Sequence, residues 1–417
     1  MDFILIKLVY ECYNFTFNKY AKPKMNFLLT VLYKSTTVLN QVLKVFFCYC
    51  LITISLLSCE YRIDQTNLAK NPDLAENRSK DTKNQVEKKF VTIIAAGDIM
   101  MGTTYPSSLL PPNDGKEILD SVKSYLRGGD IVIGNLEGPL LDKGGHPKRC
   151  IDKFGNLSRN CHSFRVPERY GAYLKNAGFN YMCLANNHAN DMGTPGKKST
   201  MRVLDSLGIK YSGLLTNPIA IIEKEELKIG VAAFSPNNGT VSINDHRNAK
   251  KIVSELKKSC NIVIVTFHGG GEGTSFQNVK DRQEYYLNEN RGNVYRFSRD
   301  VIDAGADLVI GHGPHVTRSL DYYKGKLIAY SLGNFCTYGK FGLGGEFGIA
   351  PILQVKLTSS GEFVSGNIVP IKQINRGFPV PDDKKRAIKT LQRLLKQDFP
   401  ESNLVIRDNG ELTVTAQ

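Results

Sequence analysis

Short apolar runs alternate with segments in which apolar residues recur at helical spacing, from Phe90 to about residue 330. The runs are rich in Val, Ile and Leu, and they end at glycines or polar clusters, as strands buried on both faces do. Strands that alternate with helices predict βαβ units and a parallel sheet. We predict strands at 91–96, 130–133, 179–184, 261–267, 308–310 and 327–330. We predict helices at 117–126, 170–177, 197–207, 249–258 and 294–304.

Antiparallel additions follow from three further apolar segments. Residues 219–234 predict a hairpin with its turn at 224–226, and 349–357 with 363–371 predict a second antiparallel pair. The pattern therefore indicates an α/β fold with antiparallel additions to its parallel strands.

The end of the chain carries an amphipathic helix at 384–396 and two short strands. We expect the main domain to cover 90–376. Residues 377–417 would then form a C-terminal helix and short strands that pack on that domain.

The amino-terminal region does not have the pattern of a folded domain. Residues 45–57 form an apolar run of about signal-peptide length, directly after Lys44. The run ends in Leu-Leu-Ser-Cys, which resembles a bacterial lipobox with Cys59 as the residue that would carry lipid. We predict that 1–59 is a targeting segment and that 60–89, polar and nearly free of aromatics, is a disordered tether. The chain would be exported to the cell envelope and anchored to the membrane by lipid. An uncleaved anchor is the alternative.

The charge balance is strongly basic, with a formal net charge of +14. An excess of this size favours an anionic ligand or surface, and a merely soluble basic surface explains it equally well. The chain carries no RRM, zinc-finger or helix-turn-helix signature, so we do not expect nucleic acid as a partner.

Side chains that bind metals stand at the carboxyl ends of five predicted strands. Ligands collect at this edge in open α/β sheets. A solvated turn is the alternative for any single strand end, but five on successive strands favour a site. The mixture of carboxylate, amide and imidazole suits Mn, Fe or Zn, and its ligands outnumber a four-coordinate site, so we expect two divalent ions. The candidate metal ligands are Asp98, Glu137, Asn187, His268, His312 and His315.

Six motifs at or beside these strand ends carry a family resemblance. They are Gly97-Asp98, Asn135-Leu136-Glu137, Ala-Asn-Asn-His-Ala at 185–189 with Asp191, His268 with Glu272, Gly-His-Gly-Pro-His at 311–315 and Tyr-Ser-Leu-Gly-Asn-Phe at 330–335. Over roughly 91–371 the chain resembles the bacterial capsule-synthesis CapA family, which is associated with poly-γ-glutamate production. That family is similar to calcineurin-like metallophosphoesterases. The resemblance implies an α/β two-sheet sandwich flanked by helices, which is the four-layer metallophosphoesterase-like fold. It also implies a metal-dependent hydrolase of that type.

The resemblance also implies a role for each matching ligand. Asp98 would bind the first metal ion, and Glu137 would take the place of the bridging carboxylate. Asn187 and His268 would bind the second ion. The last imidazoles would come from His312 and His315.

Other residues of the motifs are candidates for catalysis and substrate binding. His188 would face the substrate as general acid or phosphate contact. Asp191 and Glu272 are further catalytic candidates, with a helix cap and a surface position as their alternatives. The candidate substrate-binding residues are Asn135, Asn186 and Asn334; for Asn186 and Asn334, holding a turn is the alternative.

Two departures from the phosphoesterase pattern leave two functions open. Phosphoesterases place a histidine two residues after the first aspartate, where this chain has Met100, and they separate the last histidines by one residue rather than two. In the first function, the chain is a membrane-tethered, metal-dependent hydrolase or transferase acting on an anionic polymer or phosphoester. In the second, it is a non-catalytic subunit that binds the polymer or its capsule synthase.

Two cysteines bracket a polar loop in the middle of the chain. Cys150 and Cys161 flank Ile-Asp-Lys-Phe-Gly-Asn-Leu-Ser-Arg-Asn. An exported chain meets an oxidising compartment, so we predict a disulfide between them.

Overall fold

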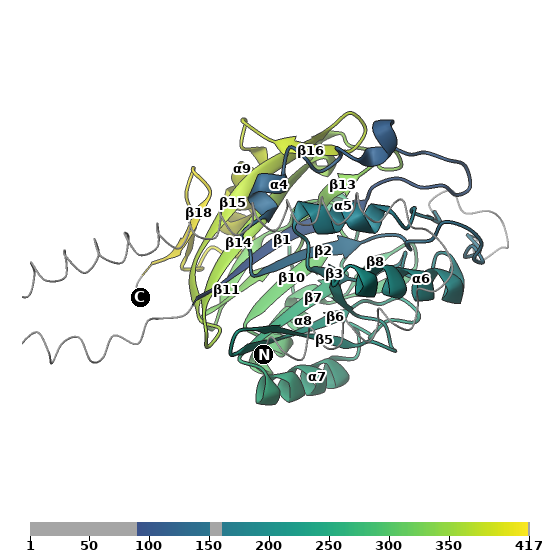
Figure 1. Cartoon of the computed structure of the whole chain (residues 1–417). Helices are drawn as coiled ribbons and strands as arrows, with labels where there is room; N and C mark the ends of the chain where they lie inside the picture. The colour runs from purple at the N-terminus through teal and green to yellow at the C-terminus, as the bar shows by residue number, and fades with distance from the viewer. Residues whose placement is uncertain (1–89, 151–160, 416–417) are drawn as a thin grey trace, which may run out of the picture. The chain divides into compact units, whose positions relative to one another are not determined.

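The computed structural model describes residues 90–150 and 161–415, which belong to one compact unit, Lys88–Gln417. Its larger sheet is built from β1 (Phe90–Met100), β2 (Ile131–Leu136), β3 (Tyr181–Cys183), β4 (Lys210–Ser212), β13 (Asn334–Thr337), β14 (Ile349–Thr358), β15 (Phe363–Ile374), β16 (Phe378–Pro381), β17 (Leu404–Ile406) and β18 (Glu411–Val414). The strand order is β17-β18-β15-β14-β1-β2-β3-β4, with β13 beside β1 and β16 beside β15 (Figure 1).

The second large sheet has the order β11-β12-β10-β7-β6-β5. These strands are β5 (Ile219–Lys224), β6 (Leu227–Phe234), β7 (Ile262–His268), β10 (Leu308–His312), β11 (Leu320–Tyr323) and β12 (Lys326–Ala329). A separate hairpin is formed by β8 (Glu284–Tyr286) and β9 (Glu289–Gly292).

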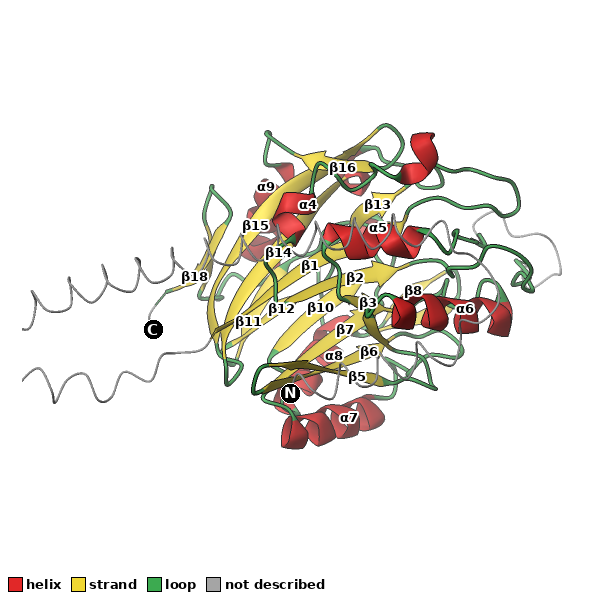
Figure 2. Ribbon diagram, viewed as in Figure 1, coloured by secondary structure: helices red, strands yellow, loops and turns green. Residues whose placement is uncertain are grey.

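The two sheets face each other, and helices cover their outer sides (Figure 2). In β1, Ile93 packs against Ile264 of β7 in the core between the sheets, whereas its neighbour Ile94 belongs to an outer cluster. That outer cluster contains α5 (Tyr170–Ala177) and α6 (Gly193–Ser206). On the other side, α7 (His246–Ser259) and α8 (Val294–Asp303) pack on the second sheet. Because successive strand residues point to opposite faces, the apolar runs fill both cores.

The predicted α/β two-sheet sandwich is therefore confirmed, with four layers. The hairpin of β5 and β6 and the antiparallel pair of β14 and β15 form as expected. The C-terminal helix α9 (Arg386–Asp398) places Ile388 and Leu391 in the core between the sheets. No helix of residues 90–150 and 161–415 is long and apolar enough to cross a membrane.

The predicted helix at 117–126 is wrong for most of its length. Only α4 (Lys123–Leu126) is helical there. Asn113 and Asp114 both have positive φ, and the chain then forms turns that still bury Ile118 and Leu119. The apolar spacing is thus satisfied without a helix.

Several strands extend further than predicted, which changes where the site residues lie. β1 runs to Met100 and β2 to Leu136, so Asp98 and Asn135 lie within their strands rather than beyond them. β13 was not predicted, and it pairs in parallel with β1, opposite Asp98. Gly97 permits this arrangement, because a Cβ there would clash with the carbonyl oxygen of Gly333.

Candidate metal and catalytic site

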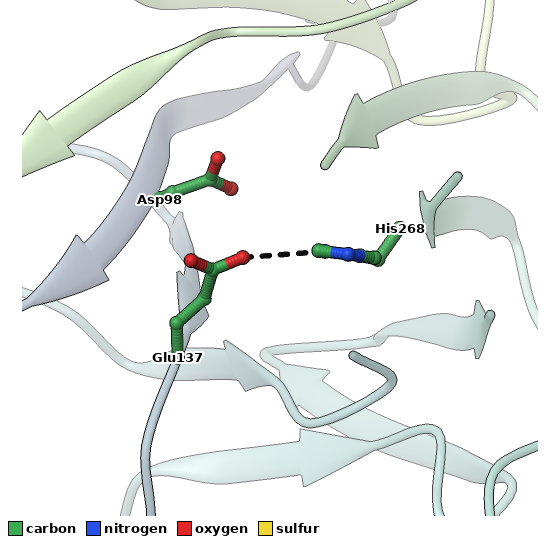
Figure 3. A group of neighbouring side chains, drawn as sticks. All are labelled: Asp98, Glu137 and His268. Atoms are coloured by element: carbon green, nitrogen blue, oxygen red, sulfur yellow. Dashed lines mark ion pairs between the residues drawn. The ribbon is translucent and has the colours of Figure 1, made fainter. Parts of the chain in front are cut away.

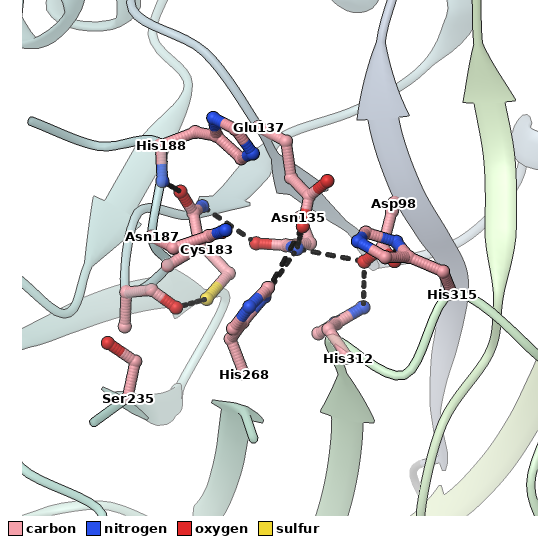
Figure 4. Close-up of polar contacts among 12 residues, drawn as sticks. Asp98, Asn135, Glu137, Cys183, Asn187, His188, Ser235, His268, His312 and His315 are labelled. Atoms are coloured by element: carbon pink, nitrogen blue, oxygen red, sulfur yellow. Dashed lines mark hydrogen bonds and ion pairs between the residues drawn. The ribbon is translucent and has the colours of Figure 1, made fainter. Parts of the chain in front are cut away.

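The site lies where the carboxyl ends of strands from both sheets meet (Figure 4). Asp98 in β1 is flanked by Asn135 of β2 on one side and by Asn334 of β13 on the other. His268 at the end of β7 is paired with His312 at the end of β10. All five side chains are fully buried. The parallel register therefore brings together residues that are far apart in the sequence.

Asp98 is the most highly connected carboxylate of the site. It accepts a hydrogen bond from Asn135 Nδ2 at 2.8 Å, and its other oxygen lies 3.0 Å from His315 Nδ1. His312 Nδ1 lies 3.6 Å from Asp98 Oδ1. Burial by itself raises the pKa of Asp98, but the adjacent imidazoles of His312 and His315 hold that pKa well below its usual range. Burial lowers the pKa of His315, and the carboxylates of Glu137 and Asp98 raise it to about 10.

Glu137 follows β2 and points toward His268 (Figure 3). Its Oε1 accepts from Asn135 Nδ2 at 3.1 Å and lies 3.3 Å from His268 Nδ1. Burial, and then the charge of Asp98, raise the pKa of Glu137 well above its ordinary value. Ligand atoms of Asp98, Glu137 and His268 lie within 4.8 Å of one another. The structure thus brings three of the six predicted metal ligands into one tight group, which we call the carboxylate–histidine group.

Arg291 is a functional candidate that the sequence did not reveal. It lies in β9 and is 1% exposed. Its Nη2 contacts His268 Nε2 at 3.1 Å, and its guanidinium also pairs with Glu272 and Glu289 at 3.4 and 3.0 Å. Burial, and then the nearby charge of Arg291, lower the pKa of His268 well below its ordinary value. Only tertiary packing identifies this residue, because its local sequence resembles a polar surface turn.

His188 forms a second polar cluster beside the metal-ligand candidates. Its Nδ1 lies 2.8 Å from Asp191 Oδ2, and the ring of Phe164 stacks on its ring at 4.4 Å. Asp191 also accepts from the Phe164 N–H at 2.7 Å and pairs with Lys148 Nζ at 2.6 Å. Asp191 does not cap α6, since the N-cap residue there is Met192 and no side chain caps it. Burial lowers the pKa of His188 despite Asp191.

The three asparagines predicted to bind substrate are hydrogen-bonded within the protein. Asn186 Nδ2 donates to Asn135 Oδ1 at 2.9 Å, and Asn135 in turn donates to Asp98. Asn334 Oδ1 lies 3.0 Å from His315 Nδ1. Their contacts orient the candidate ligands, and contact with a substrate stays a prediction.

Several buried polar atoms at the site have neither a hydrogen bond nor an ion pair in the described part of the chain. Among them are Glu137 Oε2, Asn187 Oδ1 and His312 Nε2, while His312 Nδ1 makes only the 3.6 Å contact with Asp98. Leaving such a group buried and unpaired costs about 1–3 kcal/mol. A carboxylate oxygen, an amide oxygen and an imidazole nitrogen are ordinary ligands of divalent transition metals. The residues present therefore fit a divalent cation, which would satisfy these atoms.

A cavity of about 710 Å³ opens beside these residues. Asn187, His188, His315, Glu272 and Arg291 are among its lining residues. Glu272 lies at the wall of this cavity and pairs with Arg291, rather than joining the carboxylate–histidine group. The volume is sufficient for a substrate of small-molecule size or for one end of a polymer.

A second cavity of about 700 Å³ shares Lys148 and Lys340 with the first. Cys150 and Cys161, on the wall of this second cavity, form a disulfide with a Cα–Cα distance of 5.2 Å. Lys148 is paired with Asp191, whereas Lys340 forms no hydrogen bond or ion pair with any described residue. The predicted targeting segment, the tether and Cys59 lie outside the described residues, as does the segment 151–160.

The fold and the site together define a two-sheet α/β protein with a buried carboxylate–histidine group at its strand ends. Residues 92–338 match the family described as "Bacterial capsule synthesis protein PGA_cap". The chain belongs to this family, and its predicted resemblance is confirmed.

Curated relatives match most of the chain. The chain is 31% identical to "PGA biosynthesis protein CapA" of Bacillus subtilis (strain 168), over 76% of this chain and 80% of that protein. It is 28% identical to "Capsule biosynthesis protein CapA" of Bacillus anthracis, over 79% and 78%. Among solved structures, calcineurin-like phosphoesterase YfkN from Bacillus subtilis is 11% identical, with 75% of this chain and 97% of that chain covered and a TM-score of 0.39.

Proposed function

We propose that this protein is a metal-dependent hydrolase or transferase of capsule synthesis that acts on an anionic polymer of the poly-γ-glutamate type or on a phosphoester. The observation that carries the proposal is a set of unfilled ligand atoms next to a cavity that is lined by Asn187 and the buried His188. The names of the relatives, which refer to capsule and PGA biosynthesis, support the substrate class.

The metal would be held by residues of the two sheets. Glu137, Asn187 and His312 offer unfilled atoms, and Asp98 and His315 stand beside them. When bound, a divalent ion such as Mn, Fe or Zn supplies Lewis-acid polarisation of a phosphoryl or carbonyl oxygen. The number of candidate ligands in the sequence favoured two ions.

The His188–Asp191 pair would handle the proton. The Asp191 carboxylate can only accept a hydrogen bond, so His188 Nδ1 carries the hydrogen of this contact. His188 Nε2 is then the atom that can exchange a proton with a substrate. Lys148 and the Phe164 N–H hold Asp191 as an acceptor, and the Phe164 ring fixes the plane of the imidazole. A proton placed at Nε2 would be given to the leaving group.

Substrate charge would be met at the junction of the two cavities. Lys340 is half-buried and faces both cavities without an ion pair among the described residues. A cation in this position favours a polyanion or phosphate group in the adjoining space.

A second function, a non-catalytic polymer-binding or synthase-associated subunit, rests on Met100. This residue is fully buried in β1, where the phosphoesterase pattern has a histidine, and it offers no ligand to a metal of the usual kind. Capsule synthase subunits would be the partners in that case. For either function we propose an exported chain, anchored in the cell envelope through lipid on Cys59.

The experiment combines metal analysis of the full chain with a panel of phosphoester and γ-glutamyl substrates. His188→Ala should abolish turnover and leave the metal content nearly intact, because His188 moves a proton and does not hold the ion. His246→Ala is the matched control, since His246 also pairs with an aspartate, Asp300, but lies on α7. Turnover that survives His188→Ala would remove His188 from the proposed mechanism, whereas no turnover with any substrate would leave the non-catalytic function.

A further inference from the structure

The Asn135 amide lies within the carboxylate–histidine group, and its orientation is fixed by its neighbour Asn186. The His188 backbone N–H donates to Asn186 Oδ1 at 3.0 Å, and Asn186 Nδ2 donates to the Leu136 carbonyl at 2.9 Å. A backbone N–H can only donate and a carbonyl can only accept. The Asn186 amide therefore has one possible orientation, with its amino group toward Asn135.

The orientation of Asn135 follows from that of Asn186. Asn186 Nδ2 donates to Asn135 Oδ1 at 2.9 Å, so the Asn135 amino group must face the opposite way. There it donates to Asp98 Oδ1 at 2.8 Å and to Glu137 Oε1 at 3.1 Å, and lies 3.4 Å from His268 Nδ1 (Figure 4). An amide NH₂ has no lone pair to give a metal. A hydrogen-bond donor thus occupies the middle of this group.

Arg291 supplies a second constraint from the other side of His268. A guanidinium only donates, so its contact with His268 Nε2 at 3.1 Å makes that nitrogen an acceptor. A neutral imidazole that accepts at Nε2 carries its hydrogen at Nδ1, the atom that faces Glu137. In this arrangement His268 offers hydrogen rather than a lone pair to the centre of the group.

We infer that this chain binds a single divalent cation, which is attracted by the unfilled atoms of the site, and that Asn135 and Arg291 exclude a second from the carboxylate–histidine group. Both oxygens of Asp98 are engaged, one by Asn135 and the other by His315. The N–H groups of Asn135 thereby hold the two carboxylates together, as a second ion would. The inference rests on the metal dependence in the proposed function, and it replaces the count of two ions expected from the sequence.

Metal stoichiometry tests this directly. After equilibrium dialysis of the full chain against Mn²⁺, elemental analysis should find one ion per chain. Asn135→Asp replaces the amino group by a carboxylate oxygen, and it should raise the content twofold, to two ions. Asn367→Asp makes the same change on β15, where Asn367 donates to Gln354 at 3.3 Å, and it should leave the content at one.

The outcomes separate the count from the function. Two ions in the unmodified chain, or one ion in a folded Asn135→Asp chain, would overturn the inference while leaving metal dependence intact. No ion in the unmodified chain would overturn metal dependence itself. If Asn135→Asp does not fold, the electron paramagnetic resonance spectrum of the Mn²⁺-loaded unmodified chain decides, because an isolated ion supports the inference and an exchange-coupled pair refutes it.

Discussion

Buried carboxylates at the two ends of the strands differ in whether their oxygens have partners within the protein. Asp307 stands just before β10, at the end away from the site, and is 2% exposed. Its Oδ2 lies 2.7 Å from Lys257 Nζ and accepts from the Val263 N–H at 2.8 Å, while Lys326 Nζ contacts Oδ1 at 2.8 Å. Both oxygens of this buried carboxylate therefore have partners within the protein.

At the other end of the same strands, ligand atoms are left unfilled. Glu137 is 0% exposed, yet its Oε2 has no partner among the described residues, and the same holds for His312 Nε2. Buried carboxylates are present at both ends, so burial alone does not distinguish a functional carboxylate from a structural one. The difference lies in unfilled ligand atoms, which destabilise the folded chain until something binds.

The strongest way to break this comparison is His312→Leu. Because His312 Nε2 is buried without a partner among the described residues, its loss should weaken metal affinity at least about 100-fold, beyond the range typical of outer-shell changes. The metal-free stability should change by only about 1 kcal/mol or less, since an unsatisfied polar group is replaced by an apolar one of similar size. Metal titration and urea unfolding in chelator would measure both. Unchanged affinity would remove His312 from the ligand set.

Metal binding at the unfilled atoms should raise the free energy of unfolding. A ligand present at 100 times its Kd stabilises the folded state by about 2.7 kcal/mol. We therefore expect the unfolding midpoint of the unmodified chain to rise with Mn²⁺ and to fall back when chelator is added. The His312→Leu chain at the same Mn²⁺ concentration is the control. An equal rise in both chains would mean that the ion binds elsewhere.

Asp307→Asn should produce the reverse of the His312 result. Breaking a buried pair by removing one charge is strongly destabilising, but the two lysines can reach water, so we expect a loss of about 2 kcal/mol. Metal content and turnover should stay unchanged, because Asp307 lies at the far end of the strands. Urea unfolding combined with metal analysis measures this. A drop in metal content would mean that the two ends are coupled.

The smallest expected effect is that of Lys340→Ala. Loss of an unpaired cation at the cavity junction should raise KM for an anionic substrate about tenfold, equivalent to about 1.4 kcal/mol, with kcat nearly constant. Lys389→Ala, an exposed lysine on α9, is the matched control. Steady-state kinetics over a range of salt concentrations would show the difference, and equal KM values in the two variants would remove Lys340 from substrate binding.

Sequence periodicity predicted the helices and strands that are determined by their own local sequence. The bounds of α5 are those expected, and its C-terminal Gly178 takes the left-handed conformation that ends helices. The strands β8, β9 and β13, of three or four residues each, were missed because their pairing partners are tertiary.

The candidate ligands could be predicted for the same reason. Each follows an apolar run, and the carboxyl ends of parallel strands share one edge. The burial of Arg291 and the direction of the Asn135 amide could not be predicted. Both depend on contacts between segments that no local pattern connects, such as the 133 residues that separate Asn135 from His268.

Long sequence separation within the site has a kinetic consequence. Asp98 and His315 are 217 residues apart, Asp98 in the larger sheet and His315 in the turn after β10 of the other, so the ligand set is complete only after most of the chain has folded. An ion that binds only the fully folded ligand set does not change the folding barrier. It slows unfolding instead. Mn²⁺ should therefore lengthen the lifetime of the folded chain in denaturant and leave its refolding rate unaltered.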